Sequence, residues 1–159
     1  MAAKAWPREE AIHLASSRPG GEAVSATGGC LCGAVRYALA NAPREVWFCH
    51  CGQCRKAQGS AFAASVPVPR GEFALVSGNS FLKAYRSSPS KRRWFCSACG
   101  SPLFSEVDGG STLRLRAGSL DEPASLQPAG HIFVADKAAW EELHDDLPKF
   151  DAREPGRSS

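Results

Sequence analysis

The sequence predicts a mainly β domain with one short helix near its C-terminal end. Short runs of β-branched and aromatic residues recur along the chain, and clusters of Gly, Pro, Asn and Ser separate them. The run at residues 111–117 alternates with a period of two, which places Leu113 and Leu115 on one face of a strand and Arg114 and Arg116 on the other. No internal repeat with a period of about 20–50 residues indicates a solenoid or a propeller.

Length and composition fit a single domain that can bury a core of its own. The chain has 159 residues, of which 43% are hydrophobic, and a formal net charge of +3. This charge is too small to indicate nucleic-acid binding by itself. The sequence shows neither an apolar run of the signal-peptide type near its start nor the ~20 consecutive apolar residues that a membrane span needs. We therefore expect a protein of the cytoplasm, where clustered cysteines are more often metal ligands than disulfides.

The expected domain covers residues 27–150, between two loose ends. Residues 1–26 contain several Pro and Gly and show no sustained periodicity, so we expect a flexible arm with at most a short helix at residues 9–15. Residues 151–159 are mostly polar, and we expect them to form a flexible tail.

Within this domain, the strands and the helix follow from local patterns. Strands are expected at residues 35–37, 45–48, 62–68, 72–76, 81–85, 93–95, 111–117 and 131–135. The strand at residues 62–68 is expected near a sheet edge, because Pro67 cannot donate a ladder hydrogen bond. Asp136 occupies the position of an N-cap for a helix at residues 137–143, and Pro148 excludes helix beyond it.

The seven cysteines fall into three motifs with the spacing of metal ligands, GGCLCG, FCHCGQC and FCSACG. These motifs contain Cys30 and Cys32; Cys49, Cys51 and Cys54; and Cys96 and Cys99. Clustered thiolates suit Zn²⁺, which takes four protein ligands in a structural site and three plus an open position in a catalytic one. Seven ligands divide naturally into four and three, so the two outer pairs would form a closed site of four cysteines and the central motif an open site of three. Gly100 lets the backbone turn toward the last pair of sulfurs.

Three other readings of the cysteines stay open at this point. A zinc-ribbon-like site from Cys51, Cys54, Cys96 and Cys99 would have a spacer of about 41 residues, longer than the usual ~15–20. His50 could complete the central site, although adjacent residues of an extended chain point in opposite directions. Otherwise His50 would act beside the ligands or face solvent. Any of the cysteine pairs could instead form a disulfide.

The motifs, in this order, resemble those of the family of glutathione-dependent formaldehyde-activating enzymes, which also includes centromere protein V. The resemblance extends over residues 27–150 and rests on TGGCLCGAVRY, CHCGQCRK, RWFCSACGSPL, AGSLDEP and HIFV, together with Trp140. It implies a β-rich, tent-like fold of stacked antiparallel sheets around two zinc sites. It assigns the structural zinc to Cys30, Cys32, Cys96 and Cys99. It assigns the catalytic zinc to Cys49, Cys51 and Cys54.

The resemblance also implies a carbon–sulfur lyase that forms or breaks S-(hydroxymethyl)glutathione, or a related adduct of a thiol and an aldehyde. The expected cofactor is Zn²⁺ in both sites, and the expected partners are glutathione or a similar small thiol and formaldehyde or another small aldehyde. A zinc ion with an open position can bind a substrate thiol and keep it deprotonated. Because three thiolates weaken the Lewis acidity of the ion, we favour delivery of the thiolate over polarisation of the carbonyl.

The alternative is a zinc-stabilised module that binds nucleic acid or an acidic protein without catalysis. The basic run of Lys91, Arg92 and Arg93, followed by Trp94 and Phe95, is the feature that favours it. So short a run is more often part of a charged strand whose aromatic residues belong to the core.

Other polar and aromatic residues near the motifs are weaker candidates. The carboxylates of glutathione could be bound by the basic residues beside the motifs, but a solvated basic surface is the commoner case. These residues are Arg55, Lys56, Lys91, Arg92 and Arg93. His131 could transfer protons, although a polar residue that caps a strand end is more common. Trp47 and Phe48 could line the site, but aromatic residues in strands usually belong to the core.

Overall fold

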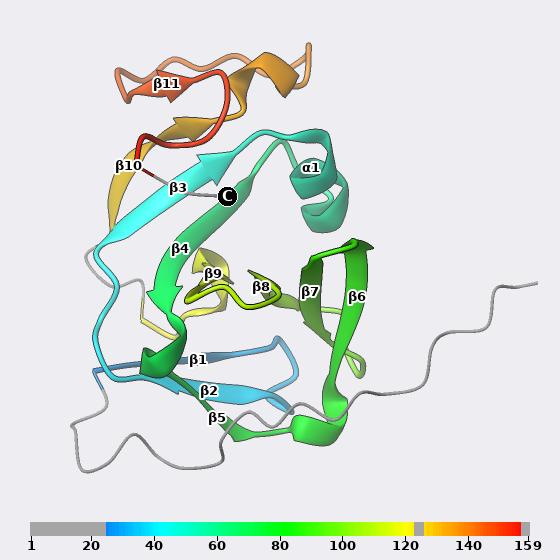
Figure 1. Cartoon of the computed structure of the whole chain (residues 1–159). Helices are drawn as coiled ribbons and strands as arrows, with labels where there is room; N and C mark the ends of the chain where they lie inside the picture. The colour runs from blue at the N-terminus through cyan, green and yellow to red at the C-terminus, as the bar shows by residue number, and fades with distance from the viewer. Residues whose placement is uncertain (1–24, 123–125, 157–159) are drawn as a thin grey trace, which may run out of the picture.

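The computed structural model describes residues 25–122 and 126–156, which form two stacked sheets and one helix (Figure 1). The smaller sheet contains β1 (Ala26–Gly29), β2 (Arg36–Leu39) and β5 (Phe73–Ser77), in the order β1–β2–β5. The larger sheet contains β3 (Glu45–Cys49), β4 (Ala63–Pro69), β6 (Leu82–Ser88), β7 (Lys91–Cys96), β8 (Pro102–Val107), β9 (Thr112–Arg116), β10 (Gln127–Ile132) and β11 (Lys149–Phe150). Its eight strands follow the order β11–β10–β3–β4–β9–β8–β7–β6. The mainly β class with stacked sheets is confirmed.

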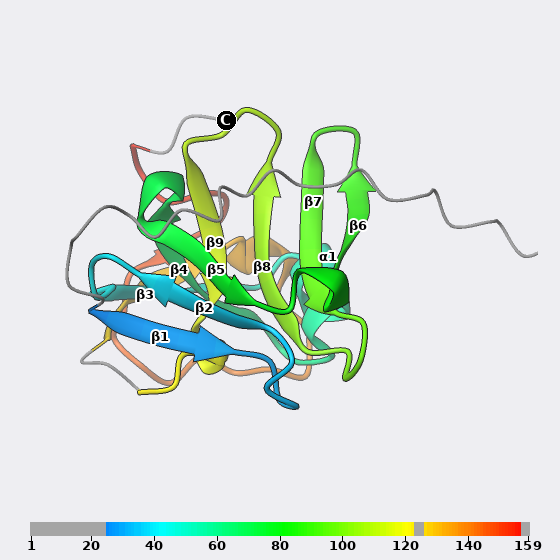
Figure 2. The ribbon, with the colours of Figure 1, turned by 90° about the horizontal axis from the view of Figure 1, so that it is seen from below.

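The core lies between the two sheets, which cross in the view from below (Figure 2). Tyr37 and Leu39 of β2 and Phe73 of β5 are buried against the larger sheet. From that sheet, Phe104 of β8 approaches Phe73 with 5.0 Å between ring centroids, and Leu115 of β9 is fully buried. Burial of such side chains stabilises the fold by about 1.5–3 kcal/mol each. A core of this kind lets the sheets form without depending wholly on metal.

One edge of the larger sheet departs from the expected antiparallel arrangement. Strand β10 pairs in parallel with both β3 and β11, and this register places His131 opposite Phe48 and Ile132 opposite Cys49. The N–H of His50 donates to the carbonyl oxygen of Ile132 at 3.0 Å, which continues the pairing past the end of β3. The parallel register therefore brings His131 next to the central cysteine motif.

Strand β4 lies inside the larger sheet, between β3 and β9, so the expected edge position is wrong. The sheet tolerates Pro67 because the pairs between β3 and β4 cover only Ala63–Ser65. Pro67 lies beyond them and is paired, with Arg114, on the β9 side alone. The proline thus occupies a local edge within a central strand.

The helix expected at residues 137–143 is also wrong. Val134–Asp136 form a 3-10 turn, and no helix follows it in residues 137–143. Lys137 leaves this turn with φ −54° and ψ 145°, which is not a helical conformation. Glu141 instead turns inward, where its carboxylate bonds with the buried His50. This tertiary contact outweighs the local helix propensity of the segment.

The helix α1 (Gly52–Gln58) begins inside the central cysteine motif. Cys51 is its N-cap, and the Sγ of Cys51 accepts a hydrogen bond from the N–H of Cys54 at 3.4 Å. Gly59 ends the helix with a positive φ of 63°, and its N–H donates to the carbonyl oxygen of Arg55. Glycine at this place is a common helix terminator. This glycine is the signal in the sequence from which the end of α1 could have been predicted.

The structure describes only part of the two expected ends of the chain. The expected arm of residues 1–26, with the short helix at residues 9–15, lies outside the described residues apart from residues 25 and 26. In the expected tail, Glu154 is buried and forms an ion pair with Arg114 of β9, so this part of the tail contacts the domain. No helix among the described residues is long and apolar enough to cross a membrane.

Candidate metal centres

The fold gathers the seven cysteines into one group of four and one group of three. Within each group, the sulfur atoms all lie within 4.8 Å of one another. The four-cysteine cluster consists of Cys30, Cys32, Cys96 and Cys99, and the three-cysteine cluster consists of Cys49, Cys51 and Cys54. All seven are free thiols, which excludes the disulfide reading. The grouping is the expected division into four and three, and it excludes the zinc-ribbon-like pairing.

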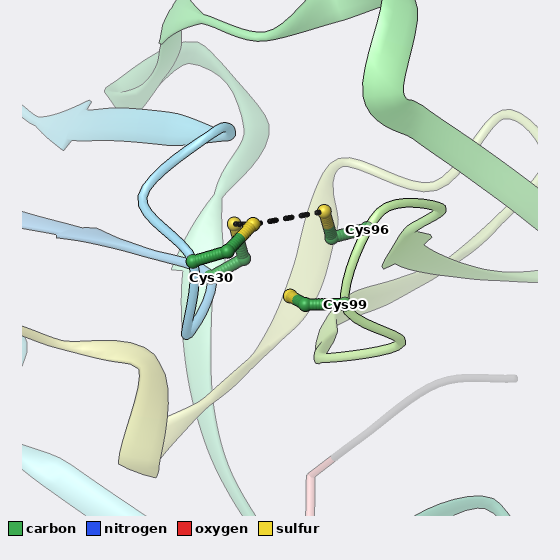
Figure 3. Close-up of side chains that lie close together, drawn as sticks. Cys30, Cys96 and Cys99 are labelled. Carbon is green, nitrogen blue, oxygen red and sulfur yellow. Dashed lines mark hydrogen bonds between the residues drawn. The ribbon is translucent and has the colours of Figure 1, made fainter.

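The four-cysteine cluster joins two turns that are distant in the sequence. Cys30 and Cys32 lie between β1 and β2, whereas Cys96 ends β7 and Cys99 lies in the turn that follows it. Figure 3 shows Cys30, Cys96 and Cys99 pointing toward one another from these turns. Gly100 has a positive φ of 77°, and its N–H donates to the carbonyl oxygen of Cys96 at 2.8 Å. This is the tight turn expected of a glycine beside a ligand pair.

The spacing of these four sulfurs fits a tetrahedral metal ion. The Sγ atoms of Cys30 and Cys32 are 3.5 Å apart, and those of Cys32 and Cys96 are 3.9 Å apart. Zinc–sulfur bonds of roughly 2.3 Å in tetrahedral geometry place neighbouring sulfurs about 3.8 Å apart. The Ser101 hydroxyl, 3.2 Å from the Cys99 sulfur, and backbone hydrogen bonds lower the pKa of Cys99 to about 5. A thiol that ionises so easily is ready to bind a cation.

The three-cysteine cluster forms where β3 gives way to α1. Cys49 is the last residue of β3, Cys51 caps the helix, and Cys54 lies in its first turn. Cys49 and Cys54 are buried, whereas Cys51 is half-buried. The cluster is therefore anchored on two rigid elements and is exposed mainly on the side of Cys51.

Hydrogen bonds among these three thiols move their pKa values apart. The pKa of Cys54 is lowered because Cys49 and Cys51 hydrogen-bond to its sulfur, and the positive charges of Arg93 and Arg116 add to this effect. The pKa of Cys49 is raised by its hydrogen bonds with the same two thiols and by burial. The cluster alone therefore holds one thiolate readily, and a cation is needed to hold all three. This donor chemistry fits a metal ion, whose binding releases thiol protons.

Two buried arginines of the larger sheet face the three-cysteine cluster. Arg93 of β7 is 9% exposed, its Nη1 lies 3.9 Å from the Cys54 sulfur, and its Nη2 donates to Oε1 of Gln53 at 3.3 Å. Arg116 of β9 is 5% exposed, and burial lowers its pKa. Neither forms an ion pair with a carboxylate among the described residues. A buried guanidinium needs a nearby negative charge, and the thiolates supply it.

The basic run on β7 does not form the exposed basic and aromatic surface that nucleic-acid binding requires. Arg93 is buried, as described above, and Arg92 forms an ion pair with Asp108 at 2.6 Å. Trp94 is buried in the core, and its Nε1–H donates to Oε1 of Glu106 at 2.9 Å. These three residues therefore contact other parts of the domain and do not form an exposed binding surface.

A hydrogen-bonded chain of two carboxylates and two histidines packs beside the three-cysteine cluster. His50 Nδ1 lies 3.0 Å from Oε2 of Glu141, and His50 Nε2 lies 2.8 Å from Nδ1 of His131. His131 Nε2 lies 3.0 Å from Oδ2 of Asp145. His50 is fully buried, and this burial lowers its pKa. Because both of its ring nitrogens have partners, His50 is not a fourth ligand and does not face solvent.

The sequence pattern did not predict this chain. His50 and His131 were candidates, but Glu141 lay in the expected helix and Asp145 had no assigned role. The parallel pairing of β10 with β3 joins the two histidines, and the irregular segment between β10 and β11 supplies both carboxylates. Predicting the chain would have required two facts that the local pattern does not contain. These are the register of β10 with β3 and the absence of a helix at residues 137–143.

Replacing Glu141 with alanine is expected to lower the free energy of unfolding by about 1–3 kcal/mol, because His50 Nδ1 is left buried without a partner. Urea unfolding of the metal-loaded protein measures this loss. The matched control is Glu142→Ala, which removes the neighbouring carboxylate from a side chain that is 79% exposed. The control should stay within about 0.5 kcal/mol of the wild type. Equal, small effects of both changes would contradict a structural role for the chain.

The remaining candidates have packing or surface positions. Arg55 donates from Nε to the carbonyl oxygen of His50 at 3.1 Å, so its guanidinium supports the motif backbone. Lys56 is exposed. Trp47 and Phe48 are half-buried and make aromatic ring contacts, in agreement with a packing role.

A mainly β domain that gathers seven cysteines into one group of four and one group of three defines a class of protein with two clusters that could each hold a metal ion. The model of the family described as glutathione-dependent formaldehyde-activating enzyme matches residues 25–136. The chain belongs to this family, and at that level its role is formaldehyde activation with glutathione. The match ends before Glu141 and Asp145, the two carboxylates of the histidine chain.

A solved structure supports the fold independently. The crystal structure of a Rhodobacter sphaeroides protein is similar, with a TM-score of 0.51 and 24% sequence identity. The similarity covers 60% of this chain and 87% of the other. At this level of identity the likeness concerns the fold.

Proposed function

We propose that the protein is a carbon–sulfur lyase that forms and breaks S-(hydroxymethyl)glutathione. In the forward direction, a bond forms between the glutathione sulfur and the carbonyl carbon of formaldehyde, and the thiol proton passes to the carbonyl oxygen. The reverse direction breaks the same carbon–sulfur bond. The observation that carries this proposal is the three-cysteine cluster, which has no fourth ligand among the described residues because His50 is bonded elsewhere.

The proposal includes a Zn²⁺ ion in each cysteine cluster. The four-cysteine cluster would hold a structural ion, and Cys49, Cys51 and Cys54 would hold the catalytic one. An ion with three protein ligands supplies an open position at which a substrate thiol stays deprotonated near neutral pH. Arg93 and Arg116 place two positive charges beside this cluster, so they favour an anionic thiolate over a neutral thiol.

An open cavity of about 660 Å³ offers space for the substrates; none of the three cysteines lines it, but Arg116, whose charge acts on Cys54, does. On one side, the cavity is lined by Cys30 of the four-cysteine cluster. On the other side, it is lined by residues of the segment 58–64, which includes the last residue of α1 and the chain after it. Binding sites for small molecules have volumes of roughly 300–1,000 Å³, so a tripeptide fits a cavity of this size. Apolar residues such as Phe62 and Leu120 line part of the wall and offer contacts for the apolar parts of a substrate.

The reaction is tested by exchange spectroscopy with zinc-loaded protein, glutathione and ¹³C-formaldehyde. We expect an exchange rate between free formaldehyde and the adduct that rises in proportion to the protein concentration. The matched sample contains Glu142→Ala protein, which should give the wild-type rate because Glu142 lies outside both clusters. A rate equal to the uncatalysed rate at every protein concentration would refute this reaction.

A further inference from the structure

The cavity beside α1 contains two buried polar groups that lack partners. Within the described residues, Nε of Arg116 and Oε1 of Gln58 are inaccessible to solvent and form no hydrogen bond. Both residues line the open cavity, and both also line a smaller cavity of about 200 Å³. Because nearly all buried polar groups in native proteins are hydrogen-bonded, two orphaned groups on the same walls indicate a missing ligand.

Arg116 differs from the other side chains that have an orphaned atom. The other charged side chains with an orphaned atom all take part in ion pairs: Arg92 with Asp108, Arg114 with Glu154, and Glu106 with Arg92. Besides its electrostatic interaction with the three-cysteine cluster, Arg116 forms two long hydrogen bonds within the described residues, from Nη1 to the carbonyl oxygen of Arg114 at 3.5 Å and from Nη2 to the hydroxyl of Ser105 at 3.4 Å. Its guanidinium is therefore available to a stronger acceptor.

The other arginine of the cavity is already committed. Arg36 lines the same cavity, but its Nη1 donates to Oδ1 of Asp121 at 2.8 Å and its Nη2 contacts the other carboxylate oxygen. Among the described residues that line the cavity, Arg116 is thus the cation without an ion-paired carboxylate. Gln58 lies beside it and offers an acceptor for an N–H group.

The charge of the metal centre also favours an anionic ligand. With zinc bound as proposed above, three thiolates and the ion carry one net negative charge. Arg93 and Arg116 are buried next to them, so before a substrate thiolate binds, the loaded centre keeps one unbalanced positive charge. An anion in the cavity would balance it, and Arg binds carboxylates through paired, parallel hydrogen bonds.

We propose that Arg116 and Gln58 form a recognition subsite for a carboxylate and a neighbouring amide N–H of the substrate. The guanidinium binds the carboxylate, and Oε1 of Gln58 accepts the hydrogen bond of the amide. The subsite selects small thiols that carry a peptide amide and a carboxylate, as glutathione does, over simple thiols. The identity of the thiol in this inference rests on the proposed function, whereas the existence of the subsite does not.

Calorimetric titration of the zinc-loaded protein with S-methylglutathione tests the subsite. The methyl group removes the thiol, so this probe cannot react and its binding reports the subsite alone. We expect Arg116→Gln to weaken binding about 10- to 100-fold, and Gln58→Leu about 3- to 10-fold. The matched control is Arg44→Gln, which removes the same charge from an exposed arginine outside the cavity and should leave the affinity unchanged.

Two results would overturn the subsite. The first is wild-type protein that fails to bind S-methylglutathione at millimolar concentrations, and the second is unchanged affinity in the Arg116 and Gln58 variants. Circular dichroism shows whether Arg116→Gln folds, and Gln58→Leu, a change at a half-buried helix position, decides the matter if it does not. Binding of the probe without formaldehyde exchange would refute the proposed reaction and leave the subsite standing.

Discussion

The variant Cys96→Ser is expected to be unfolded, or to lose more than about 15 °C in thermal midpoint, because it removes a ligand of the proposed structural metal. Cys96 is fully buried at the end of β7. It lies 64 residues from Cys32 in the sequence, but the Sγ atoms of the two residues are 3.9 Å apart. The free energy of metal binding in such a site adds directly to the free energy of folding. A typical domain has only about 5–15 kcal/mol of net stability. Thermal unfolding in zinc-containing buffer, followed by circular dichroism, measures the effect.

The matched control for this change is Cys51→Ser in the three-cysteine cluster. It also removes one thiol, but Cys51 is half-buried and caps α1, and serine is an effective N-cap. We expect this variant to stay within about 2 kcal/mol of the wild type, because the core between the sheets does not depend on this cluster. Equal losses of stability in the two variants would contradict the division into a structural and a catalytic site.

The same control variant should lose the proposed activity. Cys51→Ser is expected to lower the rate of adduct exchange by at least about 100-fold, since loss of a ligand should exceed the 10- to 100-fold effects of residues that merely support ligands. The exchange measurement uses folded variant protein incubated with excess zinc. A variant that keeps the wild-type rate would show that the three-cysteine cluster does not perform the reaction.

Much of the fold and the grouping of the cysteines could be predicted because the signals are local. Alternation in the sequence marked β9, where Leu113 and Leu115 are buried together, and the spacing of the cysteines marked both clusters. The turn at Gly100 also followed from its place beside Cys99. Patterns within a few residues were sufficient for these features.

The features that could not be predicted depend on which strands are neighbours. Arg116 was placed on the face opposite the leucines, but the pattern could not show that this face is buried against a cysteine cluster. The parallel pairing of β10 and β3 joins His50 to His131, and no local pattern encodes that register. Glu141 was misplaced in a helix because its buried partner lies 91 residues away. Tertiary contacts decide all three positions.

The central claim is that the seven cysteines form one structural and one open metal site, and native mass spectrometry with stepwise chelation tests it most directly. We predict two zinc ions per folded chain, of which mild chelation removes one while circular dichroism shows the fold retained. The ion that leaves first should be the one that Cys51→Ser protein lacks. A chain that binds a single ion in excess zinc, or that unfolds as its first ion is removed, would contradict the claim.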